Sequence, residues 1–231
     1  ALEEVPAVSG LWEHFARIFR GMGYNVWTGV LLAADYGVPQ TRERAILMAS
    51  RLGTVHPPMP THAADAQGHD LFGGATRPWV SMAEALGWDE ADFIRPRRGA
   101  GMIERHGERP DRLATLPAPT VISKSRSWIR GNQYTSTTGL YYQRRTDEPA
   151  PTITTVGRSW DWTDGSDAPK GTGVPMSMAE ASVLQSFPAA YPWTGGRSKQ
   201  FEQVGNAIPP LLAAHVLAAL GVGSLPMEVV A

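Results

Sequence analysis

The chain of 231 residues contains no cysteine. This absence excludes disulfides, thiolate metal sites and a cysteine nucleophile supplied by these residues. Lysine is also scarce, with three lysines against eighteen arginines. No apolar run approaches the ~20 residues that a membrane-spanning helix requires. The chain begins without the basic and apolar regions of a signal peptide, so we expect no targeting segment and no membrane partner.

The remaining composition is that of a folded globular chain, with 42% hydrophobic and 19% charged residues. The apolar spacing of residues 8–22 predicts a helix, and apolar runs at 26–33 and 45–49 predict two strands. Residues 35–44 are more polar, which predicts a loop outside the core. A short helix is expected at 81–86. Helix, strand, loop and strand in this order indicate an open α/β sheet.

The middle of the chain has a different character. Residues 95–170 hold thirteen basic and eight acidic residues, a local net charge of +5 inside a chain of net charge −1. Residues 117–128 and 149–160 share the pattern Pro-Ala-Pro-Thr, a β-branched run and Arg-Ser-Trp. This repeat predicts two related strands with their following loops.

Helical patterns return in the last quarter of the chain. Ser177 with Glu180 forms a capping-box pattern that predicts a helix over 177–186. Residues 209–220 are apolar on nearly all sides, which predicts a buried helix. Gly205 and Asn206 predict a tight turn before it, where free backbone N–H groups attract an anion such as a ligand carboxylate. An ordinary turn before a core helix is the alternative.

Two further segments carry charges in a regular arrangement. In Gln40-Thr41-Arg42-Glu43-Arg44, an extended backbone places Arg42 and Arg44 on one side and Glu43 on the other. Two adjacent guanidiniums suit a carboxylate, a phosphate or a carbonyl oxygen, although a pair of surface arginines is equally consistent. Glu3 and Glu4 lie at the start of the chain and by themselves indicate only a solvated end.

Taken in order and separation, these segments resemble motifs of the cytosine-C5 DNA methyltransferases. Residues 36–44 are similar to the family's Gln-x-Arg-x-Arg motif, residues 180–188 to its penultimate motif, and residues 203–210 to its final motif. Glu3-Glu4-Val5 is similar to the Glu-Asn-Val motif, with Glu4 in place of Asn. The basic, repeat-bearing segment occupies the place of the family's target-recognition domain.

The resemblance implies the C-terminal part of a Rossmann-like, AdoMet-dependent methyltransferase domain with an inserted small β-rich recognition domain. We expect a partial catalytic α/β domain at 1–88, the recognition domain at 89–174 and a return to the catalytic domain at 175–231. Three features depart from the family pattern: the Gly-rich AdoMet loop and the Pro-Cys nucleophile are absent, and Pro175 stands where an Arg is expected. We therefore expect a fragment or one part of a split enzyme, inactive as this chain alone.

In that family a thiolate adds to C6 of a flipped-out cytosine, an acid protonates N3, and C5 then takes the methyl group of S-adenosyl-L-methionine. The resemblance implies that Glu3 is the N3 partner, that Arg44 holds the cytosine O2, and that Arg42 positions the phosphate backbone or the acid. Gly205, Asn206 and Ala207 are implied to close the cofactor pocket. The nucleophile is expected from polypeptide outside this chain.

Duplex DNA is the expected substrate. Arginine and lysine among aromatic residues suit phosphate binding and base reading. The alternative is a small β-domain with solvated arginines. The histidines show no ligand spacing, so no metal is expected. The residues expected to contact DNA are Gln40, Lys124, Arg126, Arg130, Arg144, Arg145 and Arg158.

Two other functions remain open: a non-catalytic DNA-binding remnant or recognition subunit, and methylation of RNA by the same fold. The long segment before Glu180 favours a full DNA-recognition domain over RNA. A cytoplasmic, nucleoid-associated protein of bacterial or phage origin is expected. The predicted strands and the 209–220 helix would leave apolar surface uncovered, so we expect the isolated chain to associate, aggregate or require a partner.

Overall fold

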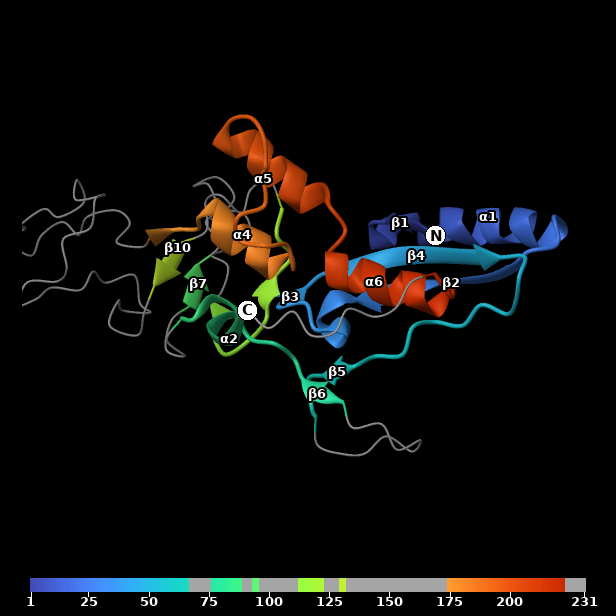
Figure 1. The fold of residues 1–231 in the computed structure, drawn as a ribbon, viewed down its shortest axis with the longest axis horizontal. Helices are drawn as coiled ribbons and strands as arrows, with labels where there is room; N and C mark the ends of the chain where they lie inside the picture. Colours follow the sequence, from blue (N-terminus) through green and yellow to red (C-terminus); the bar gives the residue numbers. More distant parts are fainter. Residues whose placement is uncertain (67–75, 89–92, 96–111, 123–128, 132–173, 223–231) are drawn as a thin grey trace, which may run out of the picture.

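The computed structural model describes residues 1–66, 76–88, 93–95, 112–122, 129–131 and 174–222, and the statements below concern these residues. Their helices and strands form two groups (Figure 1). The groups are built around separate hydrophobic clusters. One group is a small sheet with a helix on each face. The other group is mainly helical. It is joined to the sheet through the residues that precede the sheet's central strand.

The sheet contains β1 (Leu2–Glu4), β4 (Glu43–Ser50) and β2 (Asn25–Leu32), in the order β1-β4-β2. Both neighbours run antiparallel to β4, with Ile46 opposite Glu3 on one side and opposite Gly29 on the other. Because β4 is central and covered on both faces, it is a nearly continuous apolar run. The predicted strands at 26–33 and 45–49 are thereby confirmed.

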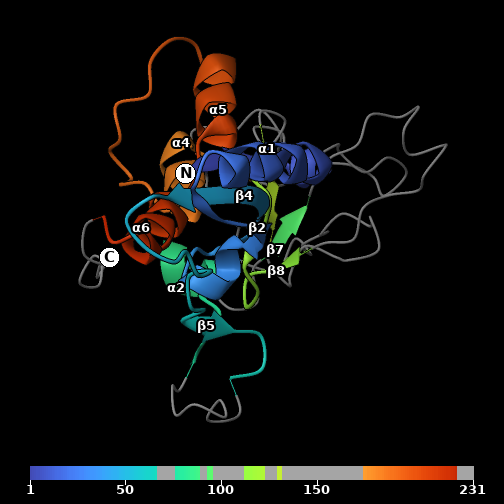
Figure 2. The ribbon, with the colours of Figure 1, turned by 90° about the vertical axis from the view of Figure 1, so that its right-hand side faces the viewer.

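Helices α1 (Ser9–Gly21) and α6 (Pro210–Ala219) lie on opposite faces of this sheet (Figure 2). The period-2 alternation of β4 divides its side chains between them. The α1 face buries Trp12 and Ala16 against Ala45 and Leu47. The α6 face buries Leu212 and Val216 against Ile46 and Met48, among others.

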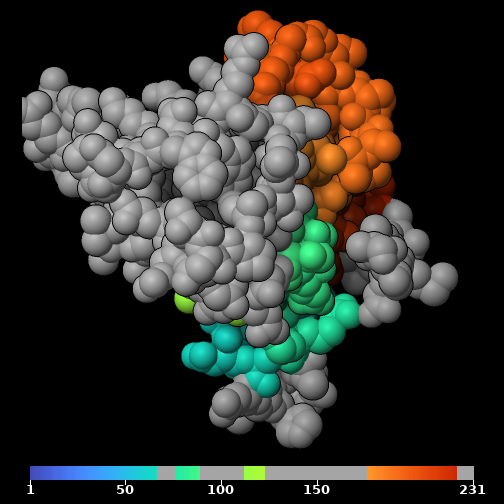
Figure 3. All heavy atoms as spheres, turned by 90° about the vertical axis from the view of Figure 1, so that its left-hand side faces the viewer, coloured from blue at the N-terminus to red at the C-terminus, as the bar shows by residue number. Residues whose placement is uncertain are grey.

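The second group contains α2 (Met82–Leu86), α4 (Met178–Leu184) and α5 (Arg197–Asn206), packed around one cluster that includes Met82, Leu184 and Phe201. The space-filling view shows the orange atoms of the α4–α5 region above the green atoms of residues 76–88 (Figure 3). Strand β9 (Ala118–Pro119) belongs to this cluster and pairs in parallel with β3 (Gln40–Thr41). Segment 118–121 therefore runs beside the residues leading into β4.

The remaining described elements are short. Between residues 93 and 175, four strands form an antiparallel sheet in the order β11-β10-β7-β8: β7 (Phe93–Arg95), β8 (Arg112–Leu113), β10 (Ile129–Gly131) and β11 (Val174–Pro175). A parallel pair of two-residue strands, β5 (His62–Ala63) and β6 (Arg77–Pro78), comes after β4 in the sequence. Single 3-10 turns occur at η1 (Pro6–Val8) and η2 (Ala33–Tyr36).

Several sequence predictions are confirmed at the level of elements. Helices occur at 9–21, 82–86 and 178–184, and the capping box is complete, because Ser177 Oγ accepts the Glu180 N–H and Glu180 accepts the Ser177 N–H. In the first copy of the repeat only Ala118–Pro119 is a described strand; the second copy lies outside the described residues.

One prediction is wrong and another is confirmed. Residues 35–44 are not outside the core: Tyr36, Val38, Gln40 and Arg42 are buried, because α4, α5 and segment 118–121 pack around them. The 210–219 helix is buried on one face and leaves apolar surface uncovered on the other, as expected for this chain. Only Leu212 and Val216 are buried, and Leu217 is 43% exposed, because the described sheet covers a single face of α6.

Candidate functional site

The strongest candidate site lies at the β1 side of the sheet, where Glu3 meets Arg44. Glu3 is opposite Ile46 in the register, and Arg44 lies two residues before Ile46 on the same face of β4. Diagonal neighbours of this kind are within reach of a long side chain. Arg44 Nε accordingly approaches Glu3 Oε1 to 2.6 Å, which confirms that the tertiary structure brings these two predicted residues together.

The ion pair is largely buried but retains some contact with solvent. The side chain of Arg44 is 11% exposed and that of Glu3 is 23% exposed. Burial lowers the pKa of Arg44, and the Glu3 carboxylate opposes this shift. Apart from the ion pair, Glu3 Oε1 has no hydrogen-bond donor among the described residues. A largely buried carboxylate with spare acceptor capacity is a candidate for contact with a ligand.

Arg42 has a different environment from Arg44. Its side chain is fully buried, and its guanidinium donates to three backbone carbonyls: Val121 O at 3.1 Å, Gly205 O at 2.8 Å and Ala207 O at 3.2 Å. Burial, followed by the charge of Arg44, lowers its pKa to about 10, so it remains charged at neutral pH. The expected contact with a DNA phosphate is therefore wrong for this conformation, because no surface of Arg42 is open to one.

Gln40 is also a structural residue in this fold, and the predicted DNA contact is corrected for the same reason. It is fully buried, and its amide is saturated by partners inside the protein. Oε1 accepts the Val121 N–H at 2.8 Å, and Nε2 donates to Leu184 O at 2.9 Å and to Gln185 Oε1 at 2.7 Å.

The segment predicted to contact the cofactor is not a tight turn. Gly205 and Asn206 are the last residues of α5, and Ala207 is its C-cap. Gly205 is buried, and the carbonyl oxygens of Gly205 and Ala207 are occupied by Arg42. Asn206 is exposed. Of the three predicted cofactor residues, Asn206 is the one whose side chain is available for a ligand.

The predicted anion site at the start of the following helix is wrong as well. Pro209 and Pro210 occupy the N-cap and the first helical position, and proline has no N–H to donate. The N–H of the next residue, Leu211, donates to Ser186 Oγ at 3.2 Å. The first residues of this helix therefore offer an anion no free N–H group up to Leu211.

One other residue expected to contact DNA lies in the described part of the chain. Arg130 lies in β10, where its backbone pairs with Ile94 and Val174. The remaining predicted residues fall outside the described ranges; these are Lys124, Arg126, Arg144, Arg145 and Arg158. Their contact with DNA stays a prediction.

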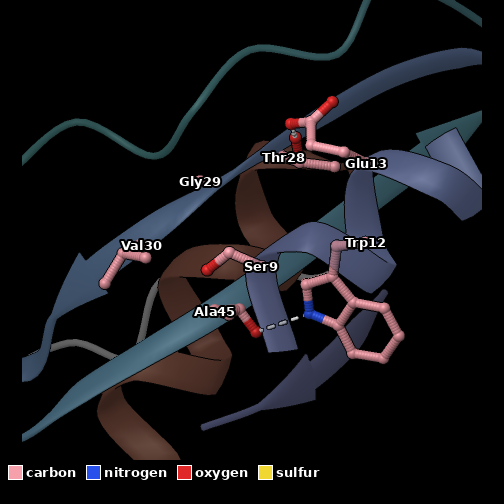
Figure 4. A pocket seen from close by; sticks show the side chains of 7 residues that line it. All are labelled: Ser9, Trp12, Glu13, Thr28, Gly29, Val30 and Ala45. Atoms are coloured by element: carbon pink, nitrogen blue, oxygen red, sulfur yellow. Dashed lines mark hydrogen bonds between the residues drawn. The ribbon is translucent and has the colours of Figure 1, made fainter. Parts of the chain in front are cut away.

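A small cavity of about 60 Å³ lies between α1 and the sheet (Figure 4). Trp12 Nε1 donates to Ala45 O at 3.0 Å along one side, and Thr28 hydrogen-bonds Glu13 along the other. Cofactor-sized ligands occupy pockets of roughly 300 Å³ or more, so this cavity is not the cofactor site. Its lining residues are Ser9, Trp12, Glu13, Thr28, Gly29, Val30 and Ala45.

The described part of the chain contains no group of three potential metal ligands among histidine, aspartate and glutamate. None of the described helices has the length and apolarity to cross a bilayer.

The sequence matches the family model of the C-5 cytosine-specific DNA methylases over residues 6–221. The chain belongs to this family. The family predicted from the motifs is thereby confirmed. The match includes Arg42, Arg44 and the 205–207 segment, whereas Glu3 precedes it.

Several curated relatives of the chain are named as Type II methylases or methyltransferases. The Type II methylase M.HgiDII of Herpetosiphon aurantiacus is 26% identical over 227 residues, covering 92% of this chain and 61% of the relative. The Type II methyltransferase M.XorII of Xanthomonas oryzae pv. oryzae is 30% identical over 229 residues, covering 86% of this chain and 51% of the relative. The methylase chain thus spans roughly half to three-fifths of the length of these relatives.

A solved structure shows that the fold is shared. The crystal structure of the S. pombe Dnmt2 methyltransferase aligns with a TM-score of 0.51, covering 95% of this chain and 66% of that chain at 13% sequence identity. The methylase chain therefore has the mixed α/β fold of a methyltransferase.

Sequence reasoning missed Gln185, the residue that joins Gln40 to the 205–207 segment. It is fully buried, it accepts from Gln40, and its Nε2 donates to Ala207 O at 2.6 Å. Its place inside the methylase's penultimate motif was a signal, because a glutamine among apolar helix residues needs buried partners.

Proposed function

We propose that this chain is the base-holding and DNA-recognising part of a DNA (cytosine-5-)-methyltransferase. The reaction is transfer of a methyl group from AdoMet to C5 of a cytosine flipped out of duplex DNA. The chain performs it with further polypeptide that carries the nucleophile. One observation carries the proposal: the contact between Glu3 and Arg44 at the side of the sheet.

This pair matches the pyrimidine edge of cytosine, where the ring nitrogen N3 and the carbonyl oxygen O2 are adjacent. A protonated Glu3 carboxyl donates to N3 while the Arg44 guanidinium donates to O2. Transfer of the Glu3 proton to N3 withdraws electrons from the ring as a thiolate adds at C6, and this makes C5 nucleophilic. Once C5 carries the methyl group, a base takes the C5 proton, the thiolate leaves C6, and the N3 proton returns to Glu3. Arg44 keeps the ring in place throughout by holding O2.

Bound AdoMet supplies the electrophilic methyl group. The described residues fit one wall of its pocket, because Asn206 is exposed at the end of α5 while the carbonyls on either side of it are held by hydrogen bonds. We assign the Asn206 amide to the cofactor. Gly205 and Ala207 contribute through their positions, since their carbonyl oxygens already have partners.

A second polypeptide segment completes the site in this proposal, for two reasons. The chemistry requires a thiolate, and the 231 residues contain no cysteine. Strand β1 pairs with β4 alone among the described strands, so its other edge is available to a further strand. Both needs are met by polypeptide bearing a Pro-Cys motif and the AdoMet loop.

The test is transfer of labelled methyl from AdoMet to duplex DNA, by this chain alone and by its mixture with an N-terminal methyltransferase part that contains Pro-Cys. We expect activity in the mixture only, and loss of that activity in Glu3→Gln. Activity of the chain alone would contradict the thiolate mechanism. No activity in either sample, with duplex binding intact, would favour a recognition protein without catalysis. Activity on RNA alone would reassign the substrate.

A further inference from the structure

The turn that follows α4 holds the linker between α5 and α6 at two points. Gln185, the C-cap of α4, donates to Ala207 O at 2.6 Å. The next residue, Ser186, accepts the Leu211 N–H at 3.2 Å. The first of these anchor points, Ala207, lies directly after the exposed Asn206.

Ser186 adopts a backbone conformation that indicates a constraint. Its φ is +62°, and it is the one non-glycine residue with positive φ in the described part of the chain. A non-glycine residue in the left-handed region costs roughly 1 kcal/mol or more and persists where its surroundings demand it. Because of this left-handed turn, the Ser186 hydroxyl and the Gln185 amide both hydrogen-bond the linker between α5 and α6.

Gln185 also connects this linker to the residues that precede the active-site strand. Its Oε1 accepts from Gln40 Nε2 at 2.7 Å, and Gln40 Oε1 in turn accepts the Val121 N–H at 2.8 Å. Arg42 donates both to Val121 O and to Ala207 O, and this closes a circuit of hydrogen bonds. The members of the circuit are Gln185, Gln40, Val121, Arg42 and Ala207. A chain of fully buried, hydrogen-bonded polar side chains transmits displacement because each side chain becomes costly to bury if its partner moves.

We propose that Gln185, with Ser186, is a positioning residue of the methyl-transfer site. Through its hydrogen bonds, Gln185 fixes the position of Asn206, at the proposed cofactor pocket, relative to the strand that carries Arg44. Neither residue touches the reacting atoms. The kinetic part of this inference rests on the proposed function, whereas its conformational part does not.

Two substitutions separate this role from general stabilisation. Gln185→Met keeps the side-chain volume and removes both hydrogen bonds. Ser186→Gly removes the bond to Leu211 but relieves the left-handed backbone, so its effects on the free energy of unfolding oppose each other. Ser182→Ala is the matched control. Ser182 is fully buried on the same helix and binds Met178 O and Trp193 Nε1, outside the circuit.

Hydrogen exchange of the chain in its complex with the Pro-Cys-containing part is the first measurement. Gln185→Met should accelerate exchange about tenfold at the amides of Val121 and Leu211, which donate to Gln40 and Ser186 and not to Gln185, as expected when ~1.4 kcal/mol of local constraint is lost. Ser182→Ala should leave both amides unchanged. Acceleration confined to α4, or equal acceleration in Ser182→Ala, would overturn the proposal.

Steady-state kinetics of the reconstituted methyltransferase is the second measurement. Gln185→Met and Ser186→Gly should each raise KM for AdoMet by about five- to tenfold, while KM for DNA stays within twofold. Unchanged KM for AdoMet in both variants would refute the positioning role. If Gln185→Met fails to fold, Ser186→Gly decides the kinetic question. If the wild type transfers no methyl group, the proposed function fails, and hydrogen exchange still decides whether the circuit couples the two segments.

Discussion

Glu3 and Arg44 lie on neighbouring antiparallel strands and touch at 2.6 Å, although forty residues of chain separate them. Their contact depends on register: a slip of one residue between β1 and β4 would turn Glu3 to the opposite face. The sheet thus determines whether the acid and the guanidinium can address one base together.

Replacement of Glu3 by glutamine should reduce methyl transfer by the reconstituted enzyme ~10²–10⁴-fold, the usual contribution of a positioned general acid. Glu4→Gln is the matched control, because Glu4 is the next residue on β1 and points to the other face. The measurement is initial rate with labelled AdoMet, together with duplex binding. Equal rates for Glu3→Gln and the wild type would remove Glu3 from the mechanism.

Replacement of Arg42 by methionine should lower the free energy of unfolding by about 2–4 kcal/mol, since it leaves the buried carbonyls of Val121 and Gly205 without a donor. Urea denaturation followed by tryptophan fluorescence measures this loss. Arg17→Met, at an exposed position of α1, should change stability by less than about 0.5 kcal/mol. Similar small effects at both positions would contradict a structural role for Arg42.

The isolated chain should associate in solution. Large apolar side chains are exposed on several elements, including Leu11 and Met22 on or beside α1 and Leu217 on α6, and the outer edge of β1 is unpaired in the described sheet. Light scattering coupled to size exclusion should show species larger than 25.0 kDa, reverting to a defined complex when the Pro-Cys-containing part is added. A monomer that melts cooperatively on its own would contradict this expectation.

Acidification should destabilise the region between η2 and α6. Burial, followed by the charges of Arg77 and His215 and opposed by Glu84, lowers the pKa of His62 below 6.5, and burial lowers the pKa of His215. The unfolded chain therefore binds protons first as pH falls. The contribution of each neutral histidine is complete above about pH 6.5 and is lost progressively below it.

His215→Phe tests this pH dependence, because it can keep the ring contact with Tyr36, whose centroid lies 5.1 Å from that of His215. Between about pH 7.5 and 5.5, the wild type should lose more thermal stability than His215→Phe. His14→Gln, at an exposed position, should follow the wild type. Parallel loss in all three proteins would show that other groups control the acid response.

The family and most helices and strands were predictable from local patterns. Capping at Ser177, apolar spacing in α1 and the β-branched run of β2 depend on neighbours in the sequence, so the residues themselves carry the information. The alternation of Arg42, Glu43 and Arg44 was predictable for the same reason: both arginines are buried, whereas Glu43 is exposed. The motifs and their order were sufficient to identify the methylase family.

Only the tertiary structure decided which of these polar side chains are structural and which one lies at the candidate site. Gln40 and Arg42 are as polar as Arg44, and polarity suggested a surface loop with contacts to DNA. Segments 118–121 and 205–207 instead enclose both residues and supply carbonyl and N–H partners, which offset the free-energy cost of burying their polar groups. Arg44, two residues further along, meets Glu3 at the side of the sheet instead. A local pattern can state that a side chain needs a partner, but only the fold determines whether that partner is the protein's own backbone or a ligand.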